Sequence, residues 1–207
     1  MPAVLFVLTS INKTLTGKPT GWYLPEAAHP YYILAPHATI DFASLTGPNP
    51  PLALDSIETF ADDADSVKFL ADETVKAKLA SAKKLADVSA KDYDAILYLA
   101  SEFFQAGKIT SAVCHGPAAL VEATDADGKS IFAGRAFTGF SNTEEETFGT
   151  VKEIPFLLED KIVSLGGKYS KAAEPFGANV VVDGNLYTGQ NPASAVPLAE
   201  AILKALK

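Results

Sequence analysis

The stretch that most constrains the fold is A-V-C-H-G-P-A-A-L, at Ala112–Leu120. It holds the chain's only cysteine, Cys114, which directly follows the apolar run Ile109–Val113. Gly116 permits a tight turn, and Pro117 suits the first turn of a helix because its missing N–H leaves no hydrogen bond unmade there. The sequence therefore predicts a strand, a sharp Cys-His-Gly turn and a helix. This is the arrangement of a nucleophile elbow.

The predicted elbow gives Cys114 a chemical role. A helix N-terminus carries free N–H groups and partial positive charge, and both stabilise a thiolate. We therefore expect the pKa of Cys114 to be lowered. A lone cysteine is more often buried and inert. The elbow and the adjacent His115 nevertheless favour a reactive nucleophile.

Other apolar runs predict an α/β sheet. Ala3–Leu8, Thr39–Ala43 and Ala95–Leu99 are typical of central parallel strands, and Val67–Leu85 has helical periodicity. A hairpin with an Asp-Gly turn is predicted near the C-terminus, followed by a helix over Ala195–Leu206.

We expect one domain over residues 1–207, built as a flavodoxin-like three-layer sandwich. Its mostly parallel sheet would carry helices on both faces, with Cys114 at the carboxyl edge of the strands, where open α/β sheets bind ligands.

One connection in this sheet is short. Parallel neighbours need a crossover of about a dozen residues or more. Only Ser101–Lys108 separates the strand-like segment ending at Ala100 from the next one. The crossover is compressed, the two strands are not ordinary neighbours, or a segment has been lost.

Composition excludes several kinds of partner. The formal net charge is −8, which argues against nucleic acid and against an anionic membrane. No apolar stretch approaches the length of a membrane span. Met1–Ser10 lacks a basic region and a cleavage motif, so it is interpreted as the first core strand. A single cysteine cannot form an internal disulfide, so we expect a reducing compartment, the cytoplasm or also the nucleus.

Six segments together resemble one family. They are T-G-W-Y-L-P-E at Thr20–Glu26, H-P-Y-Y at His29–Tyr32, D-Y-D-A-I at Asp92–Ile96, the elbow, T-G-F-S-N-T-E-E-E at Thr138–Glu146 and T-G-Q-N-P-A-S at Thr188–Ser194. The chain resembles the ThiJ/PfpI superfamily, which has a class I glutamine-amidotransferase-like fold. More narrowly, it resembles the fungal glutathione-independent glyoxalases (glyoxalase III) related to heat-shock chaperones.

The resemblance implies residue roles. Cys114 matches the family's nucleophile, and His115 the histidine beside it. Glu26 matches the carboxyl group that handles protons, although acidic residues are common in a first helical turn for dipole reasons alone. One glutamate of Glu144–Glu146 matches the acid that orients the histidine, and the spacing from the elbow favours Glu146.

The resemblance also implies a pocket and an assembly. Trp22, Tyr23 and Gly116 would line the pocket for a small dicarbonyl substrate, and a homodimer is expected.

The implied activity is conversion of methylglyoxal to D-lactate by a cofactor-independent lyase that uses no metal. The family's G-G-H-G loop, which supplies an oxyanion donor, is missing where Leu99 and Ala100 run straight into Ser101. An alternative is therefore a stress-response holdase chaperone or a redox-sensing thiol protein.

Two further interpretations rest on fewer residues. A cysteine peptidase or amidase would need only the Cys-His-acid parts. Zinc binding is disfavoured, because His29, His37 and Cys114 lack ligand spacing.

Overall fold

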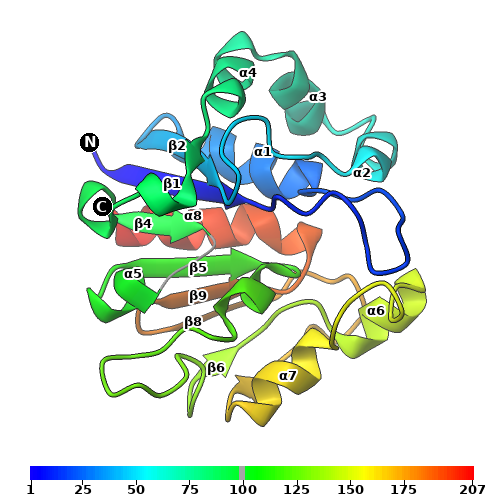
Figure 1. The fold of residues 1–207 in the computed structure, drawn as a ribbon, viewed down its shortest axis with the longest axis vertical. Helices are drawn as coiled ribbons and strands as arrows, with labels where there is room; N and C mark the ends of the chain where they lie inside the picture. Colours follow the sequence, from blue (N-terminus) through cyan, green and yellow to red (C-terminus); the bar gives the residue numbers. More distant parts are fainter. Residues whose placement is uncertain (98–100) are drawn as a thin grey trace.

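A seven-stranded sheet forms the centre of the computed structural model, which describes residues 1–97 and 101–207 (Figure 1). The strand order is β3-β2-β1-β4-β5-β9-β8, and all neighbours are parallel except the β8–β9 hairpin. The strands are β1 (Ala3–Leu8), β2 (Thr39–Ser44), β3 (Lys83–Lys84), β4 (Ala95–Leu97), β5 (Ile109–Val113), β8 (Val180–Asp183) and β9 (Leu186–Gly189).

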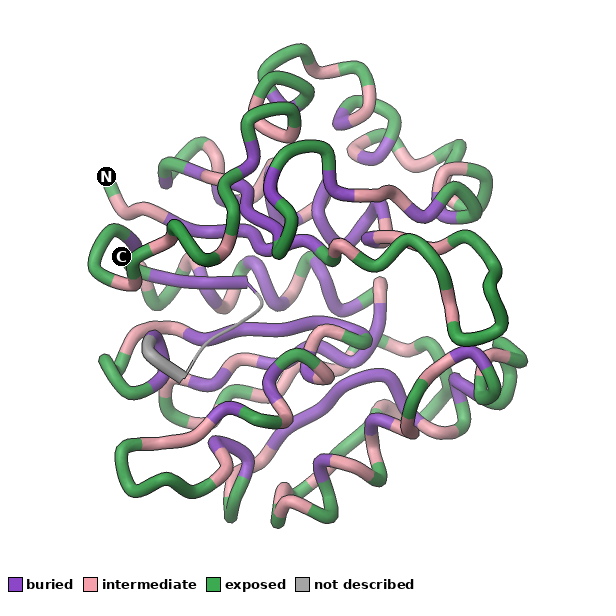
Figure 2. Tube along the Cα trace, viewed as in Figure 1, coloured by how far each residue is buried: buried purple, intermediate pink, exposed green. Residues whose placement is uncertain are grey.

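The apolar runs form the inner strands because helices and turns cover both sides of the sheet. Ala3–Leu8 and Ile109–Val113 are strands with the predicted bounds, and the C-terminal hairpin is confirmed. The strand predicted over Ala95–Leu99 ends at Leu97 in the described residues, and its last two positions lie outside them. Figure 2 shows buried residues concentrated in β1, β4 and β5.

The two faces of the sheet are covered differently. On one face, α1 (Leu24–Leu34) packs against α8 (Ala195–Ala205) and α3 (Ala64–Ala71), over the larger apolar cluster. A smaller cluster, which includes Leu5, Ile96 and Phe103, forms a second apolar core. Covering it are the short α5 (Ser101–Gln105) and single-turn 3₁₀ helices at Leu85–Asp87 and Ala90–Asp92. The flavodoxin-like α/β fold is confirmed.

The short crossover joins true neighbours. β4 and β5 pair in parallel, with Ala95 opposite Ile109 and Leu97 opposite Ser111. Five residues of the connection form α5, while the stretch 98–100, including Ala100, lies outside the described residues. The alternative in which the two strands are not ordinary neighbours is therefore wrong, and the pairing leaves the other two alternatives open.

The single helix predicted over Val67–Leu85 is wrong. The chain forms α3, then α4 (Glu73–Ala80), because the Asp72 side chain between them accepts hydrogen bonds from the amides of Thr74 and Val75. An aspartate in this position caps a new helix and ends the previous one. A further helix, α2 (Leu54–Thr59), precedes them.

A small layer lies beside the edge of the sheet that is formed by β9 and β8. It contains the parallel pair β6 (Ala136–Phe137) and β7 (Lys168–Tyr169), with α6 (Asn142–Phe148) and α7 (Leu158–Ser164) (Figure 1). The loop that follows β1 extends along the carboxyl edge of the sheet towards α6 (Figure 1). The carboxyl ends of β1 and β5, α1 and α6 therefore surround one region.

Candidate active site

Cys114 occupies a strained turn directly after β5. Its φ is 58°, in the left-handed region that non-glycine residues rarely adopt, at a cost of about 1–3 kcal/mol. The Cys114 amide donates to the Gly189 carbonyl at 2.9 Å, and its carbonyl accepts from the Phe140 amide at 2.9 Å. Hydrogen bonds from two other segments thus hold the elbow in shape. The predicted helix after it is a short 3₁₀ helix, Gly116–Leu120.

His115 lies between the sulfur and a carboxylate. Its Nδ1 is 3.4 Å from Cys114 Sγ, and its Nε2 is 2.7 Å from Glu145 Oε2. The Phe140 ring packs against the imidazole, with 4.5 Å between centroids. Cys114, His115 and Glu145 therefore form a connected cysteine–histidine–carboxylate series of the kind seen in nucleophilic catalysis.

The acid at His115 is Glu145, which corrects the prediction of Glu146. Ser141 caps α6, and its capping box with Glu144 fixes the rotation of the helix. Glu145 is then buried beneath the imidazole, whereas the neighbouring Glu146 is exposed, because consecutive helical residues point about 100° apart. Burial opposes ionisation of Glu145, but hydrogen bonds from His115 and Thr150 outweigh it and lower the pKa of this carboxyl group.

Glu144 is a buried carboxylate with a structural environment. Its Oε2 accepts from the amide and hydroxyl of Ser141 at 2.9 and 2.7 Å. Its Oε1 accepts from the Phe176 amide at 2.9 Å and from Asn191 Nδ2 at 2.8 Å. Despite burial, these donors lower the pKa of Glu144. The side chain joins α6 to two other loops and does not contact His115 in any described hydrogen bond.

Glu26 approaches the sulfur from the other side. It lies in the first turn of α1, is 8% exposed, and is hydrogen-bonded through its side chain to Cys114. Cys114 itself is 7% exposed. The predicted meeting of Glu26, Cys114 and His115 is thus present in the structure.

The expectation of a lowered thiol pKa is wrong. Burial raises the pKa of Cys114, and the charge and hydrogen bond of Glu26 raise it further. The nearby His115 backbone N–H acts in the opposite direction and is outweighed. A desolvated sulfur beside a carboxylate keeps its proton more strongly than one at an exposed helix N-terminus.

The three predicted pocket residues have different surroundings. Tyr23 is half-buried against Phe60, and burial, followed by the charges of Asp55, Glu26 and Cys114, raises its pKa. Gly116 begins the 3₁₀ helix next to His115. Trp22 is a core residue instead, because its indole N–H donates to the Pro50 carbonyl at 3.1 Å and its ring packs on Phe69. A substrate contact for Trp22 is not supported by this placement.

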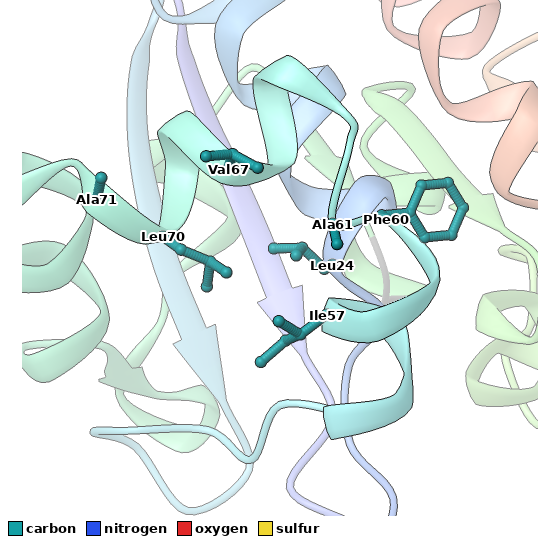
Figure 3. Close-up of a pocket in the computed structure, with 7 residues that line it drawn as sticks. All are labelled: Leu24, Ile57, Phe60, Ala61, Val67, Leu70 and Ala71. Atoms are coloured by element: carbon teal, nitrogen blue, oxygen red, sulfur yellow. The ribbon is translucent and has the colours of Figure 1, made fainter.

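A shallow apolar hollow of about 350 Å³ lies between α1, α2 and α3 (Figure 3). Figure 3 shows the side chains that line it, which are Leu24, Ile57, Phe60, Ala61, Val67, Leu70 and Ala71. Cys114 is not among them. Because the hollow has no nucleophile or titratable group in its lining, the candidate site is the region around the sulfur.

Neither a metal-binding cluster nor a membrane-spanning helix occurs in the described part of the chain. Within residues 1–97 and 101–207, no group of three or more histidine, cysteine or acidic side chains is arranged to hold a metal ion. Over the same residues, no helix is long and apolar enough to cross a membrane.

Comparison with known proteins agrees with the geometry. The chain is 30% identical over 232 positions to "Glutathione-independent glyoxalase HSP31" of Saccharomyces cerevisiae, covering 99% of this chain and 98% of the relative. It is also 30% identical to "Glyoxalase 3" of Candida albicans, with 100% and 99% covered.

Solved structures give the same fold. Rapid Encystment Protein 24 KDa of Francisella tularensis superposes with a TM-score of 0.91, at 34% identity and with 100% of both chains covered. Glyoxalase III of Candida albicans superposes with a TM-score of 0.88, at 27% identity and with 99% and 97% covered. Residues 52–205 match the DJ-1/PfpI family. The chain therefore belongs to the DJ-1/PfpI family.

Proposed function

We propose that the protein is a glutathione-independent glyoxalase that converts methylglyoxal to D-lactate. The observation that carries the proposal is the Cys114 sulfur, held between the Glu26 carboxyl group and His115 Nδ1. Relatives matched over nearly their whole length are named as glyoxalases, which supports this substrate class.

The first step is addition of the sulfur to the aldehyde. The Cys114 sulfur forms a bond to the aldehyde carbon while its proton passes to Glu26, to which it is hydrogen-bonded. The aldehyde oxygen then takes up a proton, giving a hemithioacetal. A thiol with a raised pKa needs such a base at the moment of attack, and Glu26 is in position to be one.

A proton shift and a hydrolysis complete the reaction. A base at the site, Glu26 or His115, removes the proton from the former aldehyde carbon, giving an enediol, and the neighbouring carbon is then protonated. The product of this shift is a thioester on Cys114. Water cleaves it, releasing lactate and restoring the thiol, so the net change is addition of one water to methylglyoxal.

Glu145 fixes which ring nitrogen of His115 can act as a base. Because hydrogen bonds lower the pKa of Glu145, its carboxylate only accepts, so the proton of a neutral imidazole resides on Nε2. Nδ1, which lies 3.4 Å from the sulfur, then carries the lone pair that can act as the base in the later proton shift.

The short crossover bears on the oxyanion donors. The alignment with the Saccharomyces relative spans 232 positions although this chain has 207 residues, so part of the relative has no counterpart here. In the family, a G-G-H-G loop after the strand equivalent to β4 supplies one donor. With the His115 N–H as the remaining donor, we expect turnover about 10²–10³-fold below that of a complete site.

The direct test follows methylglyoxal loss together with D-lactate formation. The parent protein is expected to form D-lactate without glutathione, and Cys114→Ser to form none. D-lactate formation that survives Cys114→Ser would refute the proposed chemistry.

A second candidate is a holdase chaperone. The observation that favours it is an aromatic patch of Phe140, Phe148 and Phe176, whose rings contact one another and of which Phe148 is 53% and Phe176 37% exposed. Such a patch suits transient contact with unfolded chains. Suppression of client aggregation by Cys114→Ala, with no dicarbonyl turnover by the parent, would favour this function. A redox sensor is less well supported, since selective oxidation needs an accessible, ionised thiol.

A further inference from the structure

We propose that Thr150 is a positioning residue for the active site, and that a clasp around Glu153 holds Thr150 in place. The proposal rests on the proposed function, in which His115 presents Nδ1 to the sulfur. It concerns residues that do not touch substrate.

Thr150 forms a hydrogen bond with the Glu145 carboxylate oxygen that His115 does not contact. The Thr150 hydroxyl donates to Glu145 Oε1, while His115 Nε2 is 2.7 Å from Oε2. The Thr150 amide also donates to the Glu145 carbonyl at 3.1 Å. Both carboxylate oxygens are therefore engaged, and the plane of the carboxylate is fixed relative to the imidazole.

The position of Thr150 follows from how α6 ends. Gly149 caps the helix in the left-handed conformation, with φ 73°, and turns the chain back so that Thr150 lies beside Glu145. A glycine adopts this conformation without strain. The geometry that brings the hydroxyl to the carboxylate is thus built into the helix end.

Glu153 connects this turn to the loop after β1. Its amide donates to the Thr150 carbonyl at 2.7 Å. Its carboxylate accepts from the hydroxyls of Thr14 and Thr16, and from Lys18 Nζ at 2.6 Å. We call Thr14, Thr16, Lys18 and Glu153 the loop clasp.

The loop clasp has a backbone component as well, since the Leu15 amide donates to the Glu153 carbonyl at 3.1 Å. A continuous series of hydrogen bonds thus runs from the loop after β1, through Glu153, Thr150 and Glu145, to His115. The loop lies along the carboxyl edge of the sheet and reaches the region of α6 (Figure 1). Ordering of this loop is therefore coupled to the orientation of the catalytic histidine.

The test reads the tautomer of His115 by ¹⁵N NMR. The chain has three histidines, so the ring signals can be assigned with a His115→Asn reference. In the parent, neutral His115 is expected to be predominantly protonated on Nε2. Thr150→Val keeps the shape of the side chain but removes the hydroxyl, and we expect a mixture of tautomers and a 3–10-fold loss of kcat, on the order of one lost hydrogen bond. Thr150→Ser restores the donor and is expected to restore both readouts.

The contribution of the loop clasp is tested by substitutions in the loop after β1. Thr14→Ala/Thr16→Ala removes two donors to Glu153 without altering α6, and a smaller shift of the His115 tautomer is expected. The proposal is overturned if folded Thr150→Val keeps the parental tautomer, or if Thr150→Ser behaves like Thr150→Val. The tautomer is measured without substrate, so a parent with no glyoxalase activity would refute the proposed function and leave this result readable.

Discussion

Two buried glutamates lie on opposite sides of Cys114, Glu26 at the sulfur and Glu145 behind His115. They take part in pKa shifts of opposite direction. Glu26 faces the thiol, and its charge adds to burial in raising the pKa of Cys114. Glu145 faces an imidazole and a hydroxyl, and these donors lower its own pKa. One glutamate is thus placed to exchange a proton with the thiol, while the other is held as an anion beside a histidine. The residue type is the same, and the neighbours decide the role.

The largest effect is expected on the Glu26 side. Glu26→Gln cannot accept the thiol proton, so D-lactate formation should fall about 10²–10⁴-fold, the usual contribution of a general base. Covalent capture of Cys114 by iodoacetamide should continue. Glu58→Gln, the same substitution at an exposed position of α2, is the matched control and should retain most turnover. Near-parental activity of Glu26→Gln would remove Glu26 from the mechanism.

The pH dependence of Cys114 alkylation tests the effect of Glu26 on the thiol separately from that of Glu145. Because Glu26 raises the pKa of Cys114, Glu26→Gln should move the alkylation profile to lower pH by about one unit or more. The parent midpoint should lie above the ordinary thiol value of about 8.5. With one cysteine in the chain, the alkylation rate reports Cys114 alone. A parent midpoint below pH 7 would contradict the structure's account of this group.

Glu144 extends the comparison of the two glutamates to a third one. It adjoins Glu145 in sequence, and its buried hydrogen bonds contribute to the free energy of unfolding. Glu144→Gln places an amide N–H₂ against donors from Ser141, Phe176 or Asn191, and roughly 2–3 kcal/mol of unfolding free energy should be lost. Urea unfolding measures this, with exposed Glu146→Gln as the control. Equal stability of the two variants would show that the buried hydrogen bonds of Glu144 contribute little.

The smallest effect is expected at acid pH, in the loop clasp. Hydrogen bonds from Lys18, Thr14 and Thr16 lower the pKa of Glu153 to about 2. Since this lies below the unfolded value of about 4.3, the contribution of Glu153 to stability is complete above pH 4.3 and is lost as the pH falls towards 2. Urea midpoints measured from pH 7 to pH 3 should therefore fall less steeply for Glu153→Gln than for the parent. Parallel curves would speak against the clasp.

The sequence predicts the fold well where burial and turn chemistry agree. β1 and β5 have the predicted bounds because each is an apolar run that ends in polar or turn-forming residues. The elbow follows from Cys114, Gly116 and Pro117, and the structure confirms it with the positive φ of Cys114.

The errors have local physical causes. The helix predicted over Val67–Leu85 ignored Asp72, whose side chain caps a second helix. Glu146 was favoured by spacing alone, although the Ser141–Glu144 capping box in the sequence sets the helix rotation and indicates Glu145. The thiol pKa depends on burial and on the approach of Glu26 from another segment, which no local pattern contains. Thr150 was missed because its role depends on how α6 ends at Gly149.

One measurement tests the central claim most directly: D-lactate formation from methylglyoxal by the parent, Glu145→Gln and Glu146→Gln in the same assay. The two variants remove the same charge from adjacent positions, yet only Glu145 contacts His115. The account predicts parental activity for Glu146→Gln and a loss of about 10²-fold for Glu145→Gln. Equal activity of the two variants, or a parent that forms no D-lactate, would contradict it.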